Sequence, residues 1–311
     1  MTKTAWIYAG QGSQKTGMGK DFYNEYPEVR PIFESEAAGF DLKKACFEEN
    51  GASMLADTRY TQAAMAAFAA AVTLLLKNAG LSPAYTAGLS LGEYSALHAA
   101  DVFGADALLD LLAARGTYMA DASEQAGPSR MSAVLGLDDA SVIAIVEKAQ
   151  QEANAAGDGI VAAANFNSPG QVVIGGNEAA VARAEAMLKE AGAKRCIPLK
   201  TSGPFHTPLM QPAAPMLSAK LQVTPFSPQH TPVVFNITGR TAKDERVKQL
   251  LTRQISNATH FADSLRFMAD NGVDDFIEIG PGHALAGFVK KTLPGIPVRS
   301  IQTIDDLKLL L

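Results

Sequence analysis

The chain has 311 residues, of which 47% are hydrophobic and 19% are charged, with 26 Gly and 16 Pro. This composition is that of an ordinary globular α/β protein and excludes a disordered or collagen-like chain. The length favours one large domain with a smaller second one, and the formal net charge of −5 argues against general nucleic-acid binding.

Cysteines, histidines and apolar stretches narrow the class of protein further. Cys46 and Cys196 are the only cysteines and lie far apart in the sequence, so we expect reduced thiols in a cytoplasmic protein. The five histidines form no cluster at metal-ligand spacing, so we expect no metal. The most apolar stretch, 63–76, is too short to span a bilayer, and the first residues lack a signal-peptide pattern, so we expect no membrane association.

The first 130 residues alternate between strand-like and helix-like segments. The elements expected there are a strand at 5–9, a Gly-rich turn at 10–14, a helix at 63–79, a strand at 84–89, a helix at 91–100 and a helix at 105–119. Strands alternating with helices are typical of α/β folds with a mainly parallel sheet.

The pattern changes near residue 130. The expected order is a strand at 131–137, a helix at 140–156, strands at 160–166 and 171–174, a helix at 178–191 and a strand at 195–199. This βαββαβ order is that of a ferredoxin-like unit, and the Asn-Ser-Pro-Gly sequence at 167–170 suits the turn between its middle strands. We therefore expect an inserted small domain at 130–200.

The large domain then consists of 1–129 and 201–311. Its second part contributes three more expected strands, at 232–237, 275–279 and 298–302.

A serine stands at the turn between the strand at 84–89 and the helix that follows. The sequence Gly88-Leu-Ser-Leu-Gly92 fits the G-x-S-x-G nucleophile elbow, in which glycines let the chain turn sharply and present the serine hydroxyl. The following helix supplies backbone N–H groups that can stabilise an oxyanion. The motif alone is only moderately specific, because Ser90 could also be a simple helix N-cap.

A serine nucleophile needs a base, normally a histidine. His206 is the best candidate, because it lies in a Pro/Gly-rich loop, 202–210, where the chain re-enters the large domain. The remaining histidines are expected to be structural: His98, His230, His260 and His283.

Arg115 indicates the kind of substrate. The helix expected at 105–119 carries one apolar stripe with helical spacing, formed by Leu108, Leu111, Leu112 and Met119. Arg115 lies on the same stripe, and a guanidinium facing a core needs an anion because it cannot lose its charge. That anion is either a protein carboxylate or the carboxylate of a substrate held by two parallel hydrogen bonds.

Together these residues resemble the bacterial malonyl-CoA:acyl carrier protein transacylases of fatty acid synthesis. The likeness runs from the N-terminus to about residue 290 and rests on Gly10-Gln-Gly-Ser-Gln14, Gly88-Leu-Ser-Leu-Gly-Glu-Tyr94, Arg115-Gly116, the NFNSPGQVVIG segment at 165–175, Gly203-Pro-Phe-His206 and Glu278-Ile-Gly-Pro-Gly282.

The resemblance implies a role for each matching residue. Ser90 is the nucleophile, and His206 is its general base and acid. Arg115 holds the malonyl carboxylate. The backbone N–H groups of Gln11 and Leu91 form the oxyanion hole. The reaction is a ping-pong transfer of malonyl from coenzyme A to phosphopantetheinylated acyl carrier protein, without a cofactor or metal.

Three further positions follow from the same resemblance. Gln254 matches the residue whose backbone carbonyl orients the histidine, so that no acidic third triad member is needed. Phe205 precedes the histidine, as in malonyl-selective relatives, whereas Leu89 stands where many relatives have His. Both positions bear on acyl selectivity, where one extra methyl usually changes discrimination by only about 1–3 kcal/mol.

The resemblance also implies an α/β-hydrolase-like large domain with a ferredoxin-like insertion. We further expect a monomer. The last third of the chain is slightly basic, and its lysines and arginines at 240–253 are a candidate surface for an acidic carrier protein, although such residues are more often solvated helix faces.

Three other functions stay open at this point. A G-x-S-x-G hydrolase would normally place its histidine late in the chain, but more than a hundred residues follow His206. A non-catalytic binder of coenzyme A or carrier protein would not need Ser90, His206 and Arg115 together. A dinucleotide-binding protein is disfavoured because Lys15 occupies the third glycine position of G-x-G-x-x-G.

Overall fold

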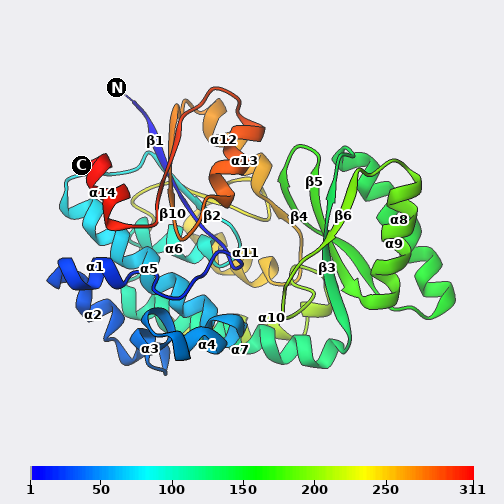
Figure 1. Ribbon diagram of the computed structural model, residues 1–311, viewed down its shortest axis with the longest axis horizontal. Coiled ribbons are helices and arrows are strands. Elements are labelled where there is room, and N and C mark those ends of the chain that lie inside the picture. Colours follow the sequence, from blue (N-terminus) through cyan, green and yellow to red (C-terminus); the bar gives the residue numbers. More distant parts are fainter. Residues whose placement is uncertain (1) are drawn as a thin grey trace.

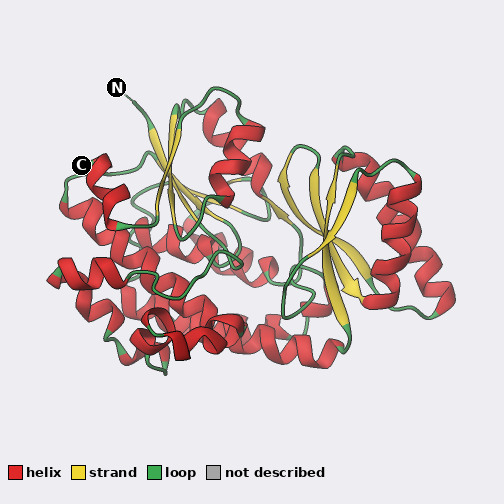
Figure 2. Ribbon diagram, in the orientation of Figure 1, coloured by secondary structure: helices red, strands yellow, loops and turns green. Residues whose placement is uncertain are grey.

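The computed structural model describes residues 2–311 and contains two β-sheets with helices packed around them (Figure 1, Figure 2). The larger sheet has the strand order β11-β10-β1-β2-β7-β8. Its strands are β1 (Thr4–Tyr8), β2 (Tyr85–Gly88), β7 (Val233–Phe235), β8 (Arg240–Thr241), β10 (Asp275–Ile279) and β11 (Val298–Ile301). All neighbours pair in parallel except β7 and β8, which confirms the expected mainly parallel α/β sheet.

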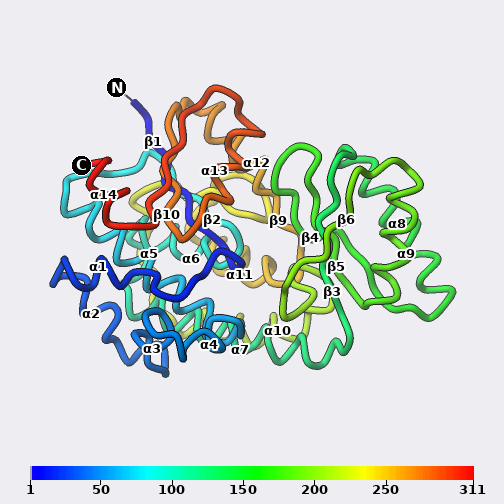
Figure 3. Tube along the Cα trace, viewed as in Figure 1, coloured from blue at the N-terminus to red at the C-terminus, as the bar shows by residue number. Residues whose placement is uncertain are grey.

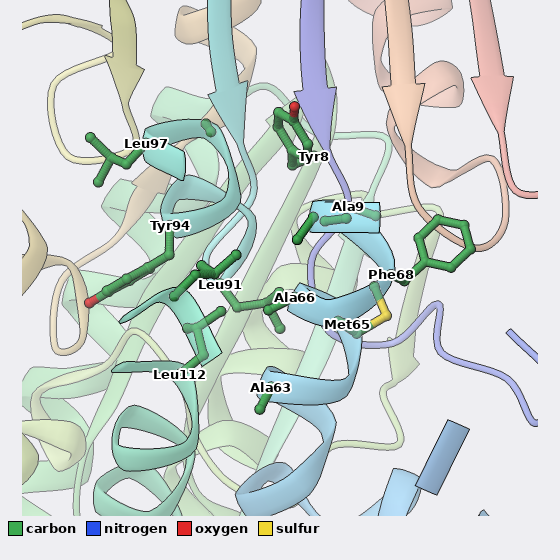
Figure 4. Close-up of a cluster of buried hydrophobic side chains, with 14 of the residues drawn as sticks. Tyr8, Ala9, Ala63, Met65, Ala66, Phe68, Leu91, Tyr94, Leu97 and Leu112 are labelled. Atoms are coloured by element: carbon green, nitrogen blue, oxygen red, sulfur yellow. The ribbon is translucent and has the colours of Figure 1, made fainter. Parts of the chain in front are cut away.

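The larger sheet is buried on both faces, and the alternation of side chains along β1 shows how. Ala5 and Ile7 pack with the core formed by α12 and α13, whereas Trp6 and Tyr8 face the core formed by α5, α6 and α7. In Figure 4 the second core shows side chains of α5, α6 and α7 close together. Parallel strands buried on both faces are expected where helices cover each face of a sheet.

The helices of the larger part are mostly short before α5 and longer after it. They are α1 (Lys20–Glu25), α2 (Arg30–Phe33), α3 (Leu42–Phe47), α4 (Ala52–Ala56), α5 (Thr58–Asn78), α6 (Gly92–Ala99), α7 (Ala105–Ala126), α10 (Ala213–Val223), α11 (Val247–Gln254), α12 (Phe261–Asp270), α13 (Ala284–Thr292) and α14 (Ile304–Leu310). Helix α7 continues seven residues beyond the predicted end at 119, because residues 120–126 contain neither glycine nor proline and the C-cap is Gly127.

Helix α5 lies at the centre of the larger core. Among the described residues it is the one helix long and apolar enough to cross a membrane, but 83% of its apolar window is buried within the fold, as in the core helix of a soluble protein. Its many alanines let α7 and the serine-bearing turn approach closely (Figure 4).

The smaller sheet is formed by the segment predicted to be an insertion. Its elements are β3 (Ser129–Leu135), α8 (Asp139–Ala156), β4 (Val161–Ser168), β5 (Gln171–Asn177), α9 (Glu178–Glu190) and β6 (Arg195–Pro198). The βαββαβ order is as predicted, and the strands pair antiparallel in the order β6-β3-β5-β4. Figure 3 shows the chain entering this part after α7 and leaving it before α10.

The smaller sheet has a fifth strand that the sequence did not suggest. Strand β9 (Thr259–His260) comes from the larger part and pairs in parallel with β4. The side chain of Asn165 on β4 donates a hydrogen bond to Thr259 Oγ1 at 2.8 Å. This pairing joins the two parts at Asn165, which lines the same cleft as His206.

Candidate active site

Ser90 stands in a strained turn between β2 and α6. Its φ is +55°, a left-handed conformation that is unusual for a residue with a side chain. The turn requires its glycines, because a Cβ on Gly88 would lie 2.0 Å from the Gly92 backbone, and one on Gly92 would lie 2.3 Å from the Tyr8 carbonyl oxygen. The G-x-S-x-G motif therefore forms the sharp strand–turn–helix predicted from the sequence.

His206 reaches the serine from the loop after β6. Its Nε2 lies 2.8 Å from Ser90 Oγ, within hydrogen-bond distance. Its Nδ1 lies 2.8 Å from the main-chain carbonyl oxygen of Gln254, at the end of α11. Because a carbonyl can only accept, Nδ1 carries the proton, and Nε2 is left to accept the serine hydroxyl.

Arg115 meets the same serine from α7. The residue is 1% exposed, and its Nη2 donates to Ser90 Oγ at 3.1 Å and to Gln254 Oε1 at 2.8 Å. Nη1 donates to the side-chain oxygen of Gln62. Tyr94 lies beneath the group, with the guanidinium carbon 5.4 Å from the ring centre.

The positive charge of Arg115 is not neutralised by a direct partner. Within residues 2–311 no carboxylate lies within 4.0 Å of this guanidinium, and its buried Nε has no hydrogen-bond partner. The partners present are the neutral amides of Gln62 and Gln254, which fix the position of the guanidinium without cancelling its charge. Of the two alternatives left open by the sequence, a site for an external anion is therefore favoured.

Two backbone N–H groups are available beside the serine. In the described part of the chain neither Gln11 nor Leu91 donates its backbone N–H to another protein group. Gln11 lies in the turn after β1, and Leu91 precedes the first residue of α6. The adjacent turns of the parallel strands β1 and β2 bring these two residues to the same edge of the sheet.

The surroundings of His206 keep its ring neutral. Burial, followed by the nearby charge of Arg115, lowers the pKa of His206 to about 4. A neutral imidazole with Nε2 on a serine hydroxyl can accept the proton of that hydroxyl near pH 7.

A cleft of about 620 Å³ opens above these groups, between the two sheets. The larger part contributes the turn at Gly10-Gln11-Gly12, together with Ser90 and Arg115, and the smaller part contributes Met131, Asn165, Asn167 and Val173. Phe205 is buried and forms part of the wall, and Leu89 also lines it. The cleft is large enough for an acyl group with part of its carrier arm.

Several contributors to the site were not found by sequence reasoning. Gln62 holds Arg115 and donates to Thr58 Oγ1 at 3.0 Å, and Thr58 donates to the Gln11 side chain at 2.8 Å. Asn236 accepts the backbone N–H of Ser90, and Glu93 in turn accepts the backbone N–H of Asn236. Buried amides next to a charged group are the signal that could have found Gln62 and Asn236, but Gln62 lies 53 positions from Arg115 and Asn236 lies 146 positions from Ser90.

The remaining histidines lie outside this site. His98 bonds the Phe103 carbonyl oxygen at 2.9 Å, and the side chain of His230 is 70% exposed. His260 and His283 stand at the N-caps of α12 and α13.

Comparison with known proteins places this geometry in a family. The family model of the acyl transferase domain matches residues 5–307. The malonyl-CoA–acyl carrier protein transacylase of Staphylococcus aureus (strain MRSA252) is 38% identical over 312 residues, covering 99% of this chain and 98% of the relative.

Two solved structures have the same fold. The crystal structure of MCAT from Streptococcus pneumoniae has a TM-score of 0.91 at 42% identity and covers 99% of each chain. A malonyl-transacylase in complex with its type II PKS acyl-carrier protein has a TM-score of 0.93 at 34% identity, covering 100% of this chain and 99% of that one. The resemblance drawn from the sequence motifs is confirmed: the chain belongs to the acyl transferase family, among the malonyl-CoA–acyl carrier protein transacylases.

Proposed function

We propose that this enzyme transfers malonyl from malonyl-CoA to the pantetheine thiol of an acyl carrier protein through a malonyl ester on Ser90. One observation carries the proposal. The side chains of His206 and Arg115 both lie within hydrogen-bond distance of Ser90 Oγ, at 2.8 and 3.1 Å. A base and a cation without a directly bonded carboxylate, both at one nucleophile, suit an acyl group that bears a carboxylate.

In the first half-reaction His206 Nε2 takes the hydroxyl proton as Ser90 Oγ attacks the thioester carbon. The oxygen of the tetrahedral intermediate accepts hydrogen bonds from the N–H groups of Gln11 and Leu91. The carbon–sulfur bond then breaks, and the proton passes from His206 to the leaving thiolate of coenzyme A. The product is a malonyl ester on Ser90.

The second half-reaction reverses these steps with a different thiol. The pantetheine thiol of the carrier protein gives its proton to His206 and attacks the ester carbon, and Ser90 leaves with that proton. Arg115 holds the malonyl carboxylate by two parallel hydrogen bonds throughout. The Gln254 carbonyl keeps the histidine in the required tautomer, so no acidic third member is needed.

The two parts of the chain are proposed as an α/β-hydrolase-like domain, 1–129 with 201–311, and a ferredoxin-like domain, 130–200. The parallel sheet with its serine turn supports the first assignment. The antiparallel order β6-β3-β5-β4 of a βαββαβ unit supports the second. Phe205, at the cleft wall, is proposed to restrict the space beside the malonyl group.

An acidic carrier protein is proposed to approach near the segment 240–253. Arg240, Lys243, Arg246 and Arg253 are exposed there, whereas Lys248 donates to the Thr224 carbonyl oxygen at 3.0 Å and is used within the fold. We also propose that the enzyme acts as a cytoplasmic monomer in fatty acid synthesis.

A hydrolase is the alternative that shares the serine and histidine. Incubation with malonyl-CoA alone, followed by intact-protein mass measurement, separates the two. Transfer predicts a stable mass increase of one malonyl group, which disappears when carrier protein bearing its pantetheine thiol is added. Release of free malonate at a comparable rate without an acceptor would support a hydrolase. Absence of any adduct on wild-type protein, with Ser90→Ala as the blank, would support a non-catalytic binder.

A further inference from the structure

The serine turn begins where the pairing of its strand ends. On the β7 side the pairing of β2 ends at Ala87 and Val234, whereas on the β1 side Gly88 still pairs with Tyr8. Asn236, next after the last residue of β7, is fully buried beside this turn. Its Nδ2 donates to the Gly88 carbonyl oxygen at 2.6 Å, and its Oδ1 accepts the N–H of Ser90 at 2.7 Å.

The carboxamide of Asn236 makes the hydrogen bonds that a neighbouring strand would otherwise make to the turn. A peptide group offers one donor and one acceptor, and a side-chain amide offers the same pair. Asn236 therefore satisfies both backbone groups that lose their partners at the turn. The left-handed φ of Ser90 costs of order 1–3 kcal/mol and persists only where surrounding contacts impose it.

Asn236 is itself held from two sides through its main chain. Its N–H donates to Glu93 Oε2 on α6 at 2.5 Å, and its carbonyl oxygen accepts the N–H of His260 on β9 at 2.7 Å. Glu93 is completely buried, and no other described group bonds its Oε1. The end of β7 is thus fixed to the helix that begins at the serine and to the edge of the smaller sheet.

The opposite side of Ser90 is also held. Gln254 Nε2 donates to the Ser90 carbonyl oxygen at 3.0 Å. A trans peptide is planar, so fixing this carbonyl also fixes the direction of the Leu91 N–H, which points the other way. Two amides therefore bracket the nucleophile, Asn236 at its N–H and Gln254 at its carbonyl.

We propose that Asn236, anchored by Glu93, is a positioning residue for the acyl transfer: it holds the Ser90 backbone so that the hydroxyl faces His206 and the Leu91 N–H faces the developing oxyanion. This inference rests on the proposed function. It assigns to Asn236 no contact with substrate.

The test is Asn236→Asp, read by the rate of Ser90 acylation by malonyl-CoA in rapid-quench mass measurements. The ionised carboxylate still accepts the Ser90 N–H but faces the Gly88 oxygen without a proton to donate. A protonated carboxyl restores both bonds. We expect acylation on the order of 100-fold slower at pH 8, as for loss of an oxyanion donor, with KM unchanged because Arg115 is untouched.

The pH profile separates positioning from a general structural role. The rate of the variant should recover as pH falls from 8 towards 5, whereas the wild-type rate should stay flat in that range because the pKa of His206 is about 4. The titratable side chains of the neighbourhood, Glu93 on α6, Arg115 on α7, His206 and His260, are present in both proteins. The wild-type profile is therefore the reference for their effects.

Two further comparisons keep the test decisive. Asn271→Asp makes the same change at an exposed asparagine, whose Nδ2 bonds the Phe267 carbonyl oxygen, and should leave acylation unaltered. If Asn236→Asp does not fold, two variants of Glu93 provide the test instead. Glu93→Gln keeps an acceptor for the Asn236 N–H and should be acylated at least tenfold faster than Glu93→Leu, which has none.

Three results would overturn the proposal. They are a rate for Asn236→Asp within threefold of wild type at pH 8, a uniformly slow rate from pH 8 to 5 in a folded variant, and equal rates for the two Glu93 variants. Failure of the wild-type protein to form any ester would instead refute the proposed function, so the two failures are distinguishable.

Discussion

Replacement of Arg115 by alanine should convert a malonyl-selective enzyme into one without preference for a carboxylate. The structure shows a buried guanidinium whose hydrogen-bond partners are Gln62, Gln254 and Ser90, with no carboxylate of the described chain in contact. An uncharged acyl group makes no ion pair with it. The change therefore removes binding energy from malonyl-CoA but little from acetyl-CoA.

The magnitude follows from the loss of one partner of a buried, hydrogen-bonded charge pair. Such losses cost about 2–5 kcal/mol, and each 1.4 kcal/mol is tenfold, so kcat/KM for malonyl-CoA should fall roughly 30-fold to several thousand-fold. The value for acetyl-CoA should change much less. Because the charge of Arg115 also lowers the pKa of His206, that pKa should rise from about 4 in the variant.

The assay measures Ser90 acylation by malonyl-CoA and acetyl-CoA in parallel from pH 4 to 8. Arg115→Lys is the matched control, because it keeps the charge but loses the planar pair of donors and should fall between wild type and Arg115→Ala. Thermal unfolding checks the fold, since the amide oxygens of Gln62 and Gln254 lose a donor. Retention of malonyl preference in folded Arg115→Ala would refute the carboxylate clamp.

One pH profile of the wild-type enzyme and two sets of substitutions test separate parts of the mechanism. The acylation rate of wild-type enzyme should fall only near pH 4, where His206 takes up a proton. The deacylation rate should begin to fall at a higher pH, because the bound malonyl carboxylate offsets the charge of Arg115 that lowers the pKa of His206. Stopped-flow rates of both steps that fall together at pH 6.5 would contradict this. Ser90→Gly and Ser90→Ala should both lose the ester and the hydroxyl hydrogen bonds, but Ser90→Gly should have the higher Tm because only glycine relieves the positive φ; a Tm below that of Ser90→Ala would contradict strain at this position. Lys243→Glu with Arg246→Glu should raise the apparent KM for carrier protein and leave exchange between coenzyme A molecules unchanged; equal effects on both would exclude docking there.

The sequence allowed the serine turn and the order of elements in the smaller sheet to be predicted, because both depend on local signals. The glycines at 88 and 92 act within five residues, and the Pro-Gly turn at 167–170 separates two neighbouring strands. The buried face of α7 followed in the same way from helical spacing, and it placed Arg115 on the correct side.

The features of the site and fold that could not be predicted depend on contacts between segments that are distant in the sequence. Nothing around residue 236 indicates that its amide completes the turn at residue 90, since 146 positions separate them. The pairing of β9 with β4 joins two short segments that are too weak in pattern to be identified alone. The amides that hold Arg115 from α5 and α11 could be assigned only after the fold brought those helices together.

A crystal structure of the malonyl ester, formed with malonyl-CoA in the absence of a carrier protein, would test the central claim most directly. Both carboxylate oxygens should lie within about 2.7–2.9 Å of Arg115 nitrogens, and the ester carbonyl oxygen should face the N–H groups of Gln11 and Leu91. A malonyl group on Ser90 whose carboxylate points into solvent, with Arg115 still bonded only to Gln62 and Gln254, would contradict it.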